Sequence, residues 1–175
     1  VPAAERAALC PCQRAPFDFA RYLPLLAFFA PFSGTDRRWM AEHLAVFDLP
    51  RGTVLHAPGD APGDAYIVLR GVAVASCARG DRHEPLRVIG PGHLTGAVPR
   101  IDGAPHDTTC LLREDSVVMR LDAEVFDAWF HGSDRRALDF LHVLTLELVA
   151  DLSCSTQALA RHVNAARVRH GGQQV

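Results

Sequence analysis

The feature that most constrains the fold is a glycine-punctuated run from Phe47 to Phe126. Within it, short segments rich in Val, Ile, Leu and Thr are separated at close intervals by Gly, Pro and Asp. Such segments form β-strands, and the residues between them favour tight turns. We predict strands at 46–49, 53–57, 65–70, 72–77, 86–89, 108–112 and 116–121, with a hairpin turn at 78–81. So many short strands turning back on one another indicate a small β-barrel or roll.

Helical patterns precede this run. Residues 17–29 carry apolar side chains at helical spacing, with a break or a new start at Pro24. Ser33 followed by Asp36 is a start signal for a second short helix. We expect both segments to cover an edge of the barrel.

Two further helices are predicted after the run. Asp122 is placed to cap the first, and Gly132 ends it. Ser133 is placed to cap a long helix that reaches about residue 169. At Gly132 we predict a hinge with backbone angles that other residues adopt only under strain. These boundaries divide the chain into a leader (1–16), a barrel domain with flanking helices (17–132), and a long C-terminal helix with its tail (133–175).

The first half of the long helix is apolar nearly all the way round, so it must be covered on two sides. One side would lie on the barrel. The other carries a coiled-coil seam formed by Leu141, Leu148, Leu152 and Leu159. Because so broad an apolar surface is rarely left in water, we interpret the seam as a homodimer contact. The alternative is a monomer whose helix folds back over its own seam.

Composition narrows the function. A chain of 175 residues is long enough for one well-cored domain with a helical appendage. Its 18 basic side chains, histidine aside, are all Arg. The net charge is -2, so the protein has no global positive field that would favour nucleic-acid binding. Polar residues or prolines interrupt the longest apolar runs, so no membrane association is expected.

The five cysteines are odd in number and lack the paired spacing of a metal site: Cys10, Cys12, Cys77, Cys110 and Cys154. This pattern argues for a reducing compartment, and we expect a cytoplasmic location. The histidines also lack a metal-ligand spacing, so neither a metal nor haem is expected. No nucleophile elbow, phosphate-gripping loop or paired-carboxylate motif is present, so we do not expect an enzyme.

An ordered set of glycines, with their flanking residues, resembles the cyclic-nucleotide-binding domain of catabolite-activator-class bacterial regulators and of cyclic-nucleotide-gated kinases and channels. The set comprises residues 49–55, 58–60, 65–74 and 90–92, followed by Gly96. The resemblance covers about residues 20–155. It implies an α+β fold, in which a double-stranded β-helix (a jelly-roll-like barrel) carries short flanking helices and a long C-terminal dimerisation helix. It further implies that the dimer is parallel.

The resemblance also implies a ligand site, the phosphate-binding cassette, which holds a cyclic nucleotide by backbone amides, a Glu and an Arg. Transferred to this sequence, the cassette begins at Gly96 and continues through Val98. Ala97 occupies the position of the Glu, and His106 occupies that of the Arg. Asp107 stands where bacterial members often have Ser, and Thr108 follows it. We therefore expect a degenerate cassette that does not bind cyclic AMP in the usual way.

Two residues could compensate for the missing Glu and Arg, which are the two side-chain anchors of a cyclic nucleotide in the family. Arg100 lies between them in the sequence and could turn into the site. His106 could pair with a phosphate if protonated, because the reference pKa of His is near 6.5. The alternatives are a solvent-facing Arg and a His that only ends a loop. The ligand thus stays open between a cyclic nucleotide and another small molecule.

Three functions remain. The first is a regulatory sensor domain that couples its pocket to the long helix. The second is the ligand-sensing half of a catabolite-activator-type transcription regulator, which would bind DNA only if a longer chain carries a helix-turn-helix, since residues 155–164 resemble that motif's first helix only faintly. The third is a module that binds no small ligand and only dimerises or docks on a partner.

Overall fold

The computed structural model describes residues 18–79 and 82–171, with side chains for 18–78 and 83–161. The predicted leader, 1–16, and the tip of the predicted hairpin turn, 80–81, lie outside the described residues. So do Cys10 and Cys12.

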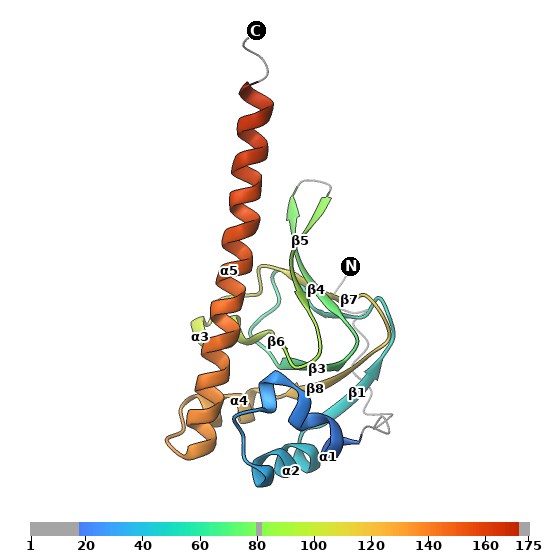
Figure 1. Cartoon of the computed structure of the whole chain (residues 1–175), viewed down its shortest axis with the longest axis vertical. Helices are drawn as coiled ribbons and strands as arrows, with labels where there is room; N and C mark the ends of the chain where they lie inside the picture. The colour runs from blue at the N-terminus through green and yellow to red at the C-terminus, as the bar shows by residue number, and fades with distance from the viewer. Residues whose placement is uncertain (1–17, 80–81, 172–175) are drawn as a thin grey trace.

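Eight strands form two antiparallel four-stranded sheets, in the orders β1-β8-β3-β6 and β2-β7-β4-β5. The strands are β1 (Ala45–Leu49), β2 (Val54–His56), β3 (Ala65–Arg70), β4 (Ala73–Arg79), β5 (Arg82–Ile89), β6 (Leu94–Thr95), β7 (Thr109–Leu112) and β8 (Ser116–Leu121). The sheets curl into a barrel with helices beside it (Figure 1). The predicted α+β class and jelly-roll-like barrel are confirmed.

The helical elements are α1 (Phe19–Tyr22), the 3-10 turns η2 (Leu23–Leu25) and η3 (Ala27–Phe29), α2 (Gly34–His43), α3 (Ala97–Asp102), α4 (Ala123–Phe130) and α5 (Arg135–Gly171). In Figure 1, α5 begins near α2 and α4, passes alongside the barrel and extends well beyond it. The helical pattern predicted for 17–29 is broken into α1 and two 3-10 turns, because Pro24 sits in the first turn of η2 and cannot continue α1.

Strands β3 and β8 lie next to each other and are buried on both faces. Successive side chains of a strand point to opposite faces. In β3, Ile67 points toward the helices while Val68 points into the barrel, and in β8 Met119 and Val118 do the same. The apolar cluster between this sheet and the helices is the outer core of the protein. It also contains aromatic residues from the helices: Phe28, Phe29, Phe32, Phe126, Trp129 and Phe140. This double burial explains why both strands are apolar nearly without interruption.

Two strands depart from the prediction. Strand β6, Leu94–Thr95, is only two residues long and was not predicted, because so short a segment carries no alternation. Strand β5 begins at Arg82 rather than at residue 86. Pro85 obscures its pattern, but β5 is an edge strand and its register shifts beside Pro85, so the missing N–H of proline is tolerated.

The predicted helix starts are partly right. The Ser33 hydroxyl accepts a hydrogen bond from the Asp36 amide, and the Asp122 carboxylate accepts one from the Val125 amide, as expected of N-caps. The start predicted at Ser133 is wrong, because the Asp134 carboxylate accepts from the amide of Ala137, 2.8 Å away.

Gly132 separates α4 from α5, but not by the mechanism predicted. Its φ angle is not in the left-handed region. A Cβ at this position would instead lie 2.7 Å from the Ala128 carbonyl oxygen and 2.9 Å from Ala137 Cβ. Glycine is therefore required because the two helices approach closely at this point.

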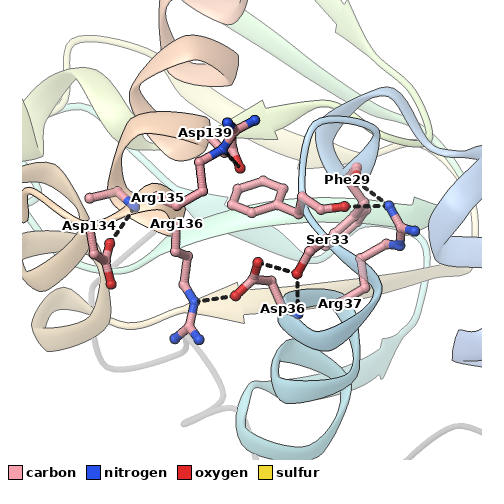
Figure 2. Close-up of polar contacts among 10 residues, drawn as sticks. Phe29, Ser33, Asp36, Arg37, Asp134, Arg135, Arg136 and Asp139 are labelled. Carbon is pink, nitrogen blue, oxygen red and sulfur yellow. Dashed lines mark hydrogen bonds and ion pairs between the residues drawn. The ribbon is translucent and has the colours of Figure 1, made fainter.

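The first turn of α5 is joined to α2 (Figure 2). The Arg136 Nε donates to an Asp36 carboxylate oxygen 2.8 Å away, and the same carboxylate accepts from the Ser33 hydroxyl. The Ser33 hydrogen bond and Arg136 hold the pKa of Asp36 below its usual value, although burial opposes them. The Arg136 guanidinium also lies over the Trp39 ring, 4.6 Å from its centroid. These contacts fix where the long helix begins.

The turn between β3 and β4 yields a stability prediction. Gly71 has a φ of 96°, and a Cβ on it would lie 2.1 Å from the Ser116 Oγ and 2.8 Å from the Ser116 Cα. We expect Gly71→Ala to lower the free energy of unfolding by about 3 kcal/mol, from backbone strain and a clash that a buried strand cannot relieve. The matched control is Gly59→Ala, where φ is 86° and nothing lies within 4 Å. Gly59→Ala should lower the free energy of unfolding by only about 1 kcal/mol. Urea unfolding of both variants checks the prediction, and equal losses would contradict it.

Candidate ligand-binding site

A cavity of about 230 Å³ lies between the barrel and α5. Its wall is formed by residues 94–99, residues 106–108, the surface of β5 around Arg87 and the face of α5 around Glu147. The predicted site residues that line it are Gly96, Ala97, Val98, His106, Asp107 and Thr108. The structure thus brings together six of the seven predicted cassette residues.

The cassette is short and rigidly placed. Strand β6 pairs with β3 and delivers the chain to Gly96, which has a φ of 84° and precedes the first residue of α3. A Cβ on Gly96 would lie 3.1 Å from the Asp64 carbonyl oxygen, so the cassette packs closely on the chain that enters β3. Ala97 is buried, whereas Val98 is exposed. Neither side chain can bind a ribose hydroxyl by a hydrogen bond.

His106 is buried and takes part in a pair of histidines. Its ring stacks on that of His56, with 4.1 Å between centroids. Its amide donates to the Asp60 carbonyl, and its carbonyl accepts from the Gly59 amide. These contacts fix the backbone of His106, the position to which the resemblance assigned the Arg.

His56 is held neutral. Burial, together with the neighbouring His106, lowers the pKa of His56 to about 4. The Nδ1 of its ring lies 3.2 Å from the Thr108 carbonyl, and the Nε2 lies 3.1 Å from the Thr95 hydroxyl. A neutral imidazole satisfies both by donating from Nδ1 and accepting at Nε2. This part of the wall therefore supplies a neutral imidazole.

Arg100 is the predicted site residue that does not line the cavity. Its guanidinium donates to the Ala123 carbonyl, 3.3 Å away, and to the carboxylate of Asp127. Both partners belong to α4. The structure thus places Arg100 between α3 and α4, facing away from the ligand site.

Sequence reasoning missed a second arginine. Arg87 on β5 lines the cavity with a side chain that is only 9% exposed. Its Nη2 donates to a Glu147 carboxylate oxygen at 2.5 Å, and its Nη1 donates to Asp151. His93 Nδ1 and the Leu94 amide donate to the same Glu147 carboxylate, at 2.9 and 3.4 Å. A signal was available, since Glu147 and Asp151 are spaced one turn apart in an apolar helix and buried acids require partners.

Charge on the cavity wall is unfavourable for an anion. The charged side chains that line it are Arg87, Asp107, Glu147 and Asp151. Burial alone would lower the pKa of Arg87, but hydrogen bonds and charges from the two α5 carboxylates outweigh it and raise that pKa. Burial raises the pKa of Asp151, and Arg87 offsets this only in part. The one guanidinium is thus already paired, and Asp107 adds a further negative charge.

Two features are absent from the described part of the chain. Among these residues, no group of three or more His, Cys, Asp and Glu side chains could hold a metal ion. No helix within them combines the length and apolar character needed to cross a membrane.

Residues 46–132 match the family model described as the cyclic nucleotide-binding domain. The chain therefore belongs to this family, as the spaced glycines implied. The matched residues include all eight strands except Ala45 at the start of β1, together with α3 and α4. No curated protein matches the chain.

Solved structures share the fold. A cyclic nucleotide-binding domain from Methylobacillus flagellatus has a TM-score of 0.69 at 17% identity, covering 82% of each chain. The Thermus thermophilus catabolite activator protein has a TM-score of 0.64 at 20% identity, covering 78% of this chain and 63% of its own. The regulatory subunit of a cAMP-independent protein kinase A from Trypanosoma brucei, as a mutant bound to cAMP, has a TM-score of 0.66 at 13% identity. That match covers 82% of this chain and 50% of the trypanosomal chain, so the chain spans half to about two thirds of two of these structures.

The buried His56 predicts a pH dependence of stability. Its folded-state pKa of about 4 lies below the reference value of 6.5, so the unfolded chain binds a proton first as the pH falls. His56 should therefore reduce the free energy of unfolding progressively between pH 6.5 and about 4, by up to about 3 kcal/mol. His56→Gln removes this proton uptake. Urea unfolding from pH 7.5 to 4.5 should show the stability difference between wild type and variant shrinking as the pH falls. A difference that stays constant would contradict the prediction.

Proposed function

We propose that this domain is a regulatory sensor whose cassette does not hold cyclic AMP or cyclic GMP in the family's manner, and which conveys the state of its cavity to α5. The observation that carries the proposal is the set of side chains at the anchor positions. Ala97 offers no acceptor to a ribose, and His106 is committed to a stack with His56. Each lost anchor reduces the binding free energy of a cyclic nucleotide by on the order of 2 to 4 kcal/mol.

The charges of the cavity support the same conclusion. Asp107 lines the cavity and would repel a phosphate there, and Arg87 is occupied by two carboxylates. Arg100, which could have replaced the lost arginine, is engaged with α4. The trypanosomal structure provides a parallel, since the kinase to which that regulatory subunit belongs is called cAMP-independent.

A route from the cavity to α5 is available in the contacts of Arg100. This residue belongs to α3, whose first residues line the cavity, and it binds α4 through Ala123 and Asp127. Helices α4 and α5 are separate elements that pack closely at Gly132. A shift of α3 would therefore be transmitted to α4 and then to the start of α5. This is the coupling that a sensor of this kind requires.

The long helix supports assembly as a homodimer. Large apolar side chains on α5 are exposed in the single chain: Leu138, Leu146, Val149, Leu152 and Leu159. Leu152 and Leu159 belong to the predicted seam. Leu148 is half-buried against the outer core and lines the cavity, and Leu141 is also half-buried. The proposed contact is thus centred on the exposed leucines, with Leu148 shared between the seam and the barrel.

A second function is favoured by the likeness to the Thermus catabolite activator protein, of which this chain spans 63%. In this alternative the domain is the sensing half of a transcription regulator, and DNA binding would reside in a further domain that follows α5 in a longer chain. A chain that only dimerises or docks, without a small ligand, is the third candidate. The parent reading frame distinguishes the second candidate from the others, because a helix-turn-helix after α5 would be visible in its sequence.

The first prediction of this proposal concerns affinity. Loss of both anchors should weaken the binding of cyclic AMP at least about a thousand-fold relative to a complete cassette, which gives a Kd above roughly 100 μM. The triple change Ala97→Glu, His106→Arg and Asp107→Ser should then raise affinity at least about ten-fold. Calorimetry at neutral pH measures both. The control for the added carboxylate is Ala104→Glu, which adds the charge of Ala97→Glu at an exposed position of the neighbouring loop and should change nothing. Low-micromolar binding by the wild type would refute the proposal.

The second prediction concerns assembly. Leu152→Asp combined with Leu159→Asp would bury unpaired charge in the dimer contact, so light scattering should show a dimer becoming a monomer with unchanged circular dichroism. Leu148 is avoided because it also packs on the core. Leu25→Asp is the control, since Leu25 is 76% exposed and belongs to η2 rather than to α5. A wild-type protein that is monomeric at concentrations of tens of micromolar would refute the proposed dimer.

A further inference from the structure

A cluster of charged side chains joins β5 to α5 at the wall of the cavity. Arg87 belongs to β5, and its partners Glu147 and Asp151 follow it by 60 and 64 residues. The side chains of Arg87 and Glu147 are each only 9% exposed. His93 and the Leu94 amide, from the chain just before the cassette, complete the cluster by donating to Glu147.

The cluster is well satisfied, which matters because a buried ion pair stabilises only when its geometry offsets the loss of hydration. Glu147 accepts from a guanidinium, an imidazole and a backbone amide. Arg87 uses separate nitrogens for the two carboxylates. Charge-assisted bonds of this kind are directional, whereas apolar packing tolerates sliding.

We propose that Arg87 acts as an internal ligand, an intramolecular latch that holds the Glu147–Asp151 turn of α5 against the barrel, so that the position of α5 does not depend on a small molecule. This inference goes beyond the proposed function, which concerns what the cavity binds. The guanidinium of Arg87, which belongs to the barrel, binds α5 directly, so no ligand is needed to join them. A ligand that moves α5 must first break these bonds or replace them.

The contacts favour a latch over a different role for Arg87, that of an anion anchor. An anchor requires a cation whose charge is available to the ligand, yet both terminal nitrogens of Arg87 are bonded to carboxylates of α5. A phosphate approaching Arg87 would also face Glu147, Asp151 and Asp107. Displacing two paired carboxylates by one anion would leave those carboxylates buried and unpaired.

The test measures hydrogen exchange along α5 in the full chain, with no ligand added. Arg87→Met removes the cation and keeps the length of the side chain. A second variant, Arg87→Met with Glu147→Gln and Asp151→Asn, removes the charges together and so guards against loss of folding. The matched control is Arg70→Met, because Arg70 of β3 forms an exposed ion pair with Asp48 of β1. All four proteins are compared on the Leu152→Asp, Leu159→Asp background, so that a partner helix does not contribute protection.

We expect amide protection in residues 146–158 to fall at least about ten-fold in both Arg87 variants and to stay unchanged in Arg70→Met. Residues 137–144, which pack on the outer core through Phe140 and Leu144, serve as the internal reference and should keep their protection. Unchanged protection at 146–158 would overturn the latch, because apolar contacts would then suffice. Equal loss at 137–144 and in β3 in both variants would overturn it as well, since the cluster would then support the whole fold.

A separate arm addresses the anchor role. Calorimetry with cyclic AMP and with inorganic phosphate is run on the wild type and on Arg87→Met. Binding that the wild type shows and Arg87→Met loses would assign Arg87 to an anion and refute the latch. Affinity that Arg87→Met retains or improves supports the latch. So does the absence of binding in both proteins, because an anchor would have bound one of these anions.

Discussion

The antiparallel pair of β3 and β8 is the constraint on which the rest of the structure depends. Ile67 lies opposite Met119 and Val68 opposite Val118, so each pair places its side chains together, one pair in the outer core and the other inside the barrel. Burial of apolar surface on both faces of one ladder fixes its register, since a shift by one residue would exchange the two cores. Strand β6 pairs with the other edge of β3, so the cassette takes its position from the same ladder.

The cavity wall combines this framework with its own set of charged and polar groups. Gly96 adopts a left-handed backbone conformation before α3, and the surrounding wall offers a neutral imidazole, three carboxylates and one paired guanidinium. In a low-dielectric cavity these charges matter more than in water. The charges of the wall are therefore independent of the turns that build the barrel, because fold and site depend on different residues.

The sequence sufficed for the features that depend on local chemistry. Spaced glycines and alternating apolar residues predicted the barrel, and Ser33 and Asp122 were recognised as caps by their distance from the helix start. Features that depend on pairing between distant segments were not predictable in this way. The direction of Arg100 is set by Asp127, and the partners of Arg87 lie 60 and 64 residues away. Ser and Asp are both residue types that cap helices, so the sequence alone did not decide between Ser133 and Asp134, and the structure uses Asp134.

The long helix is held by contacts of two kinds, and their difference determines what can move. At its start, Arg136 binds Asp36, and Phe140 and Leu144 pack on the outer core. Apolar packing resists separation strongly but translation weakly, because its energy follows buried area. The Arg87 cluster resists translation, because its bonds require particular atoms at particular distances. A signal that reaches α5 through α4 would therefore meet its main resistance at Glu147, next to the cavity, so the site where a ligand would act and the point that fixes the helix are the same turn of α5.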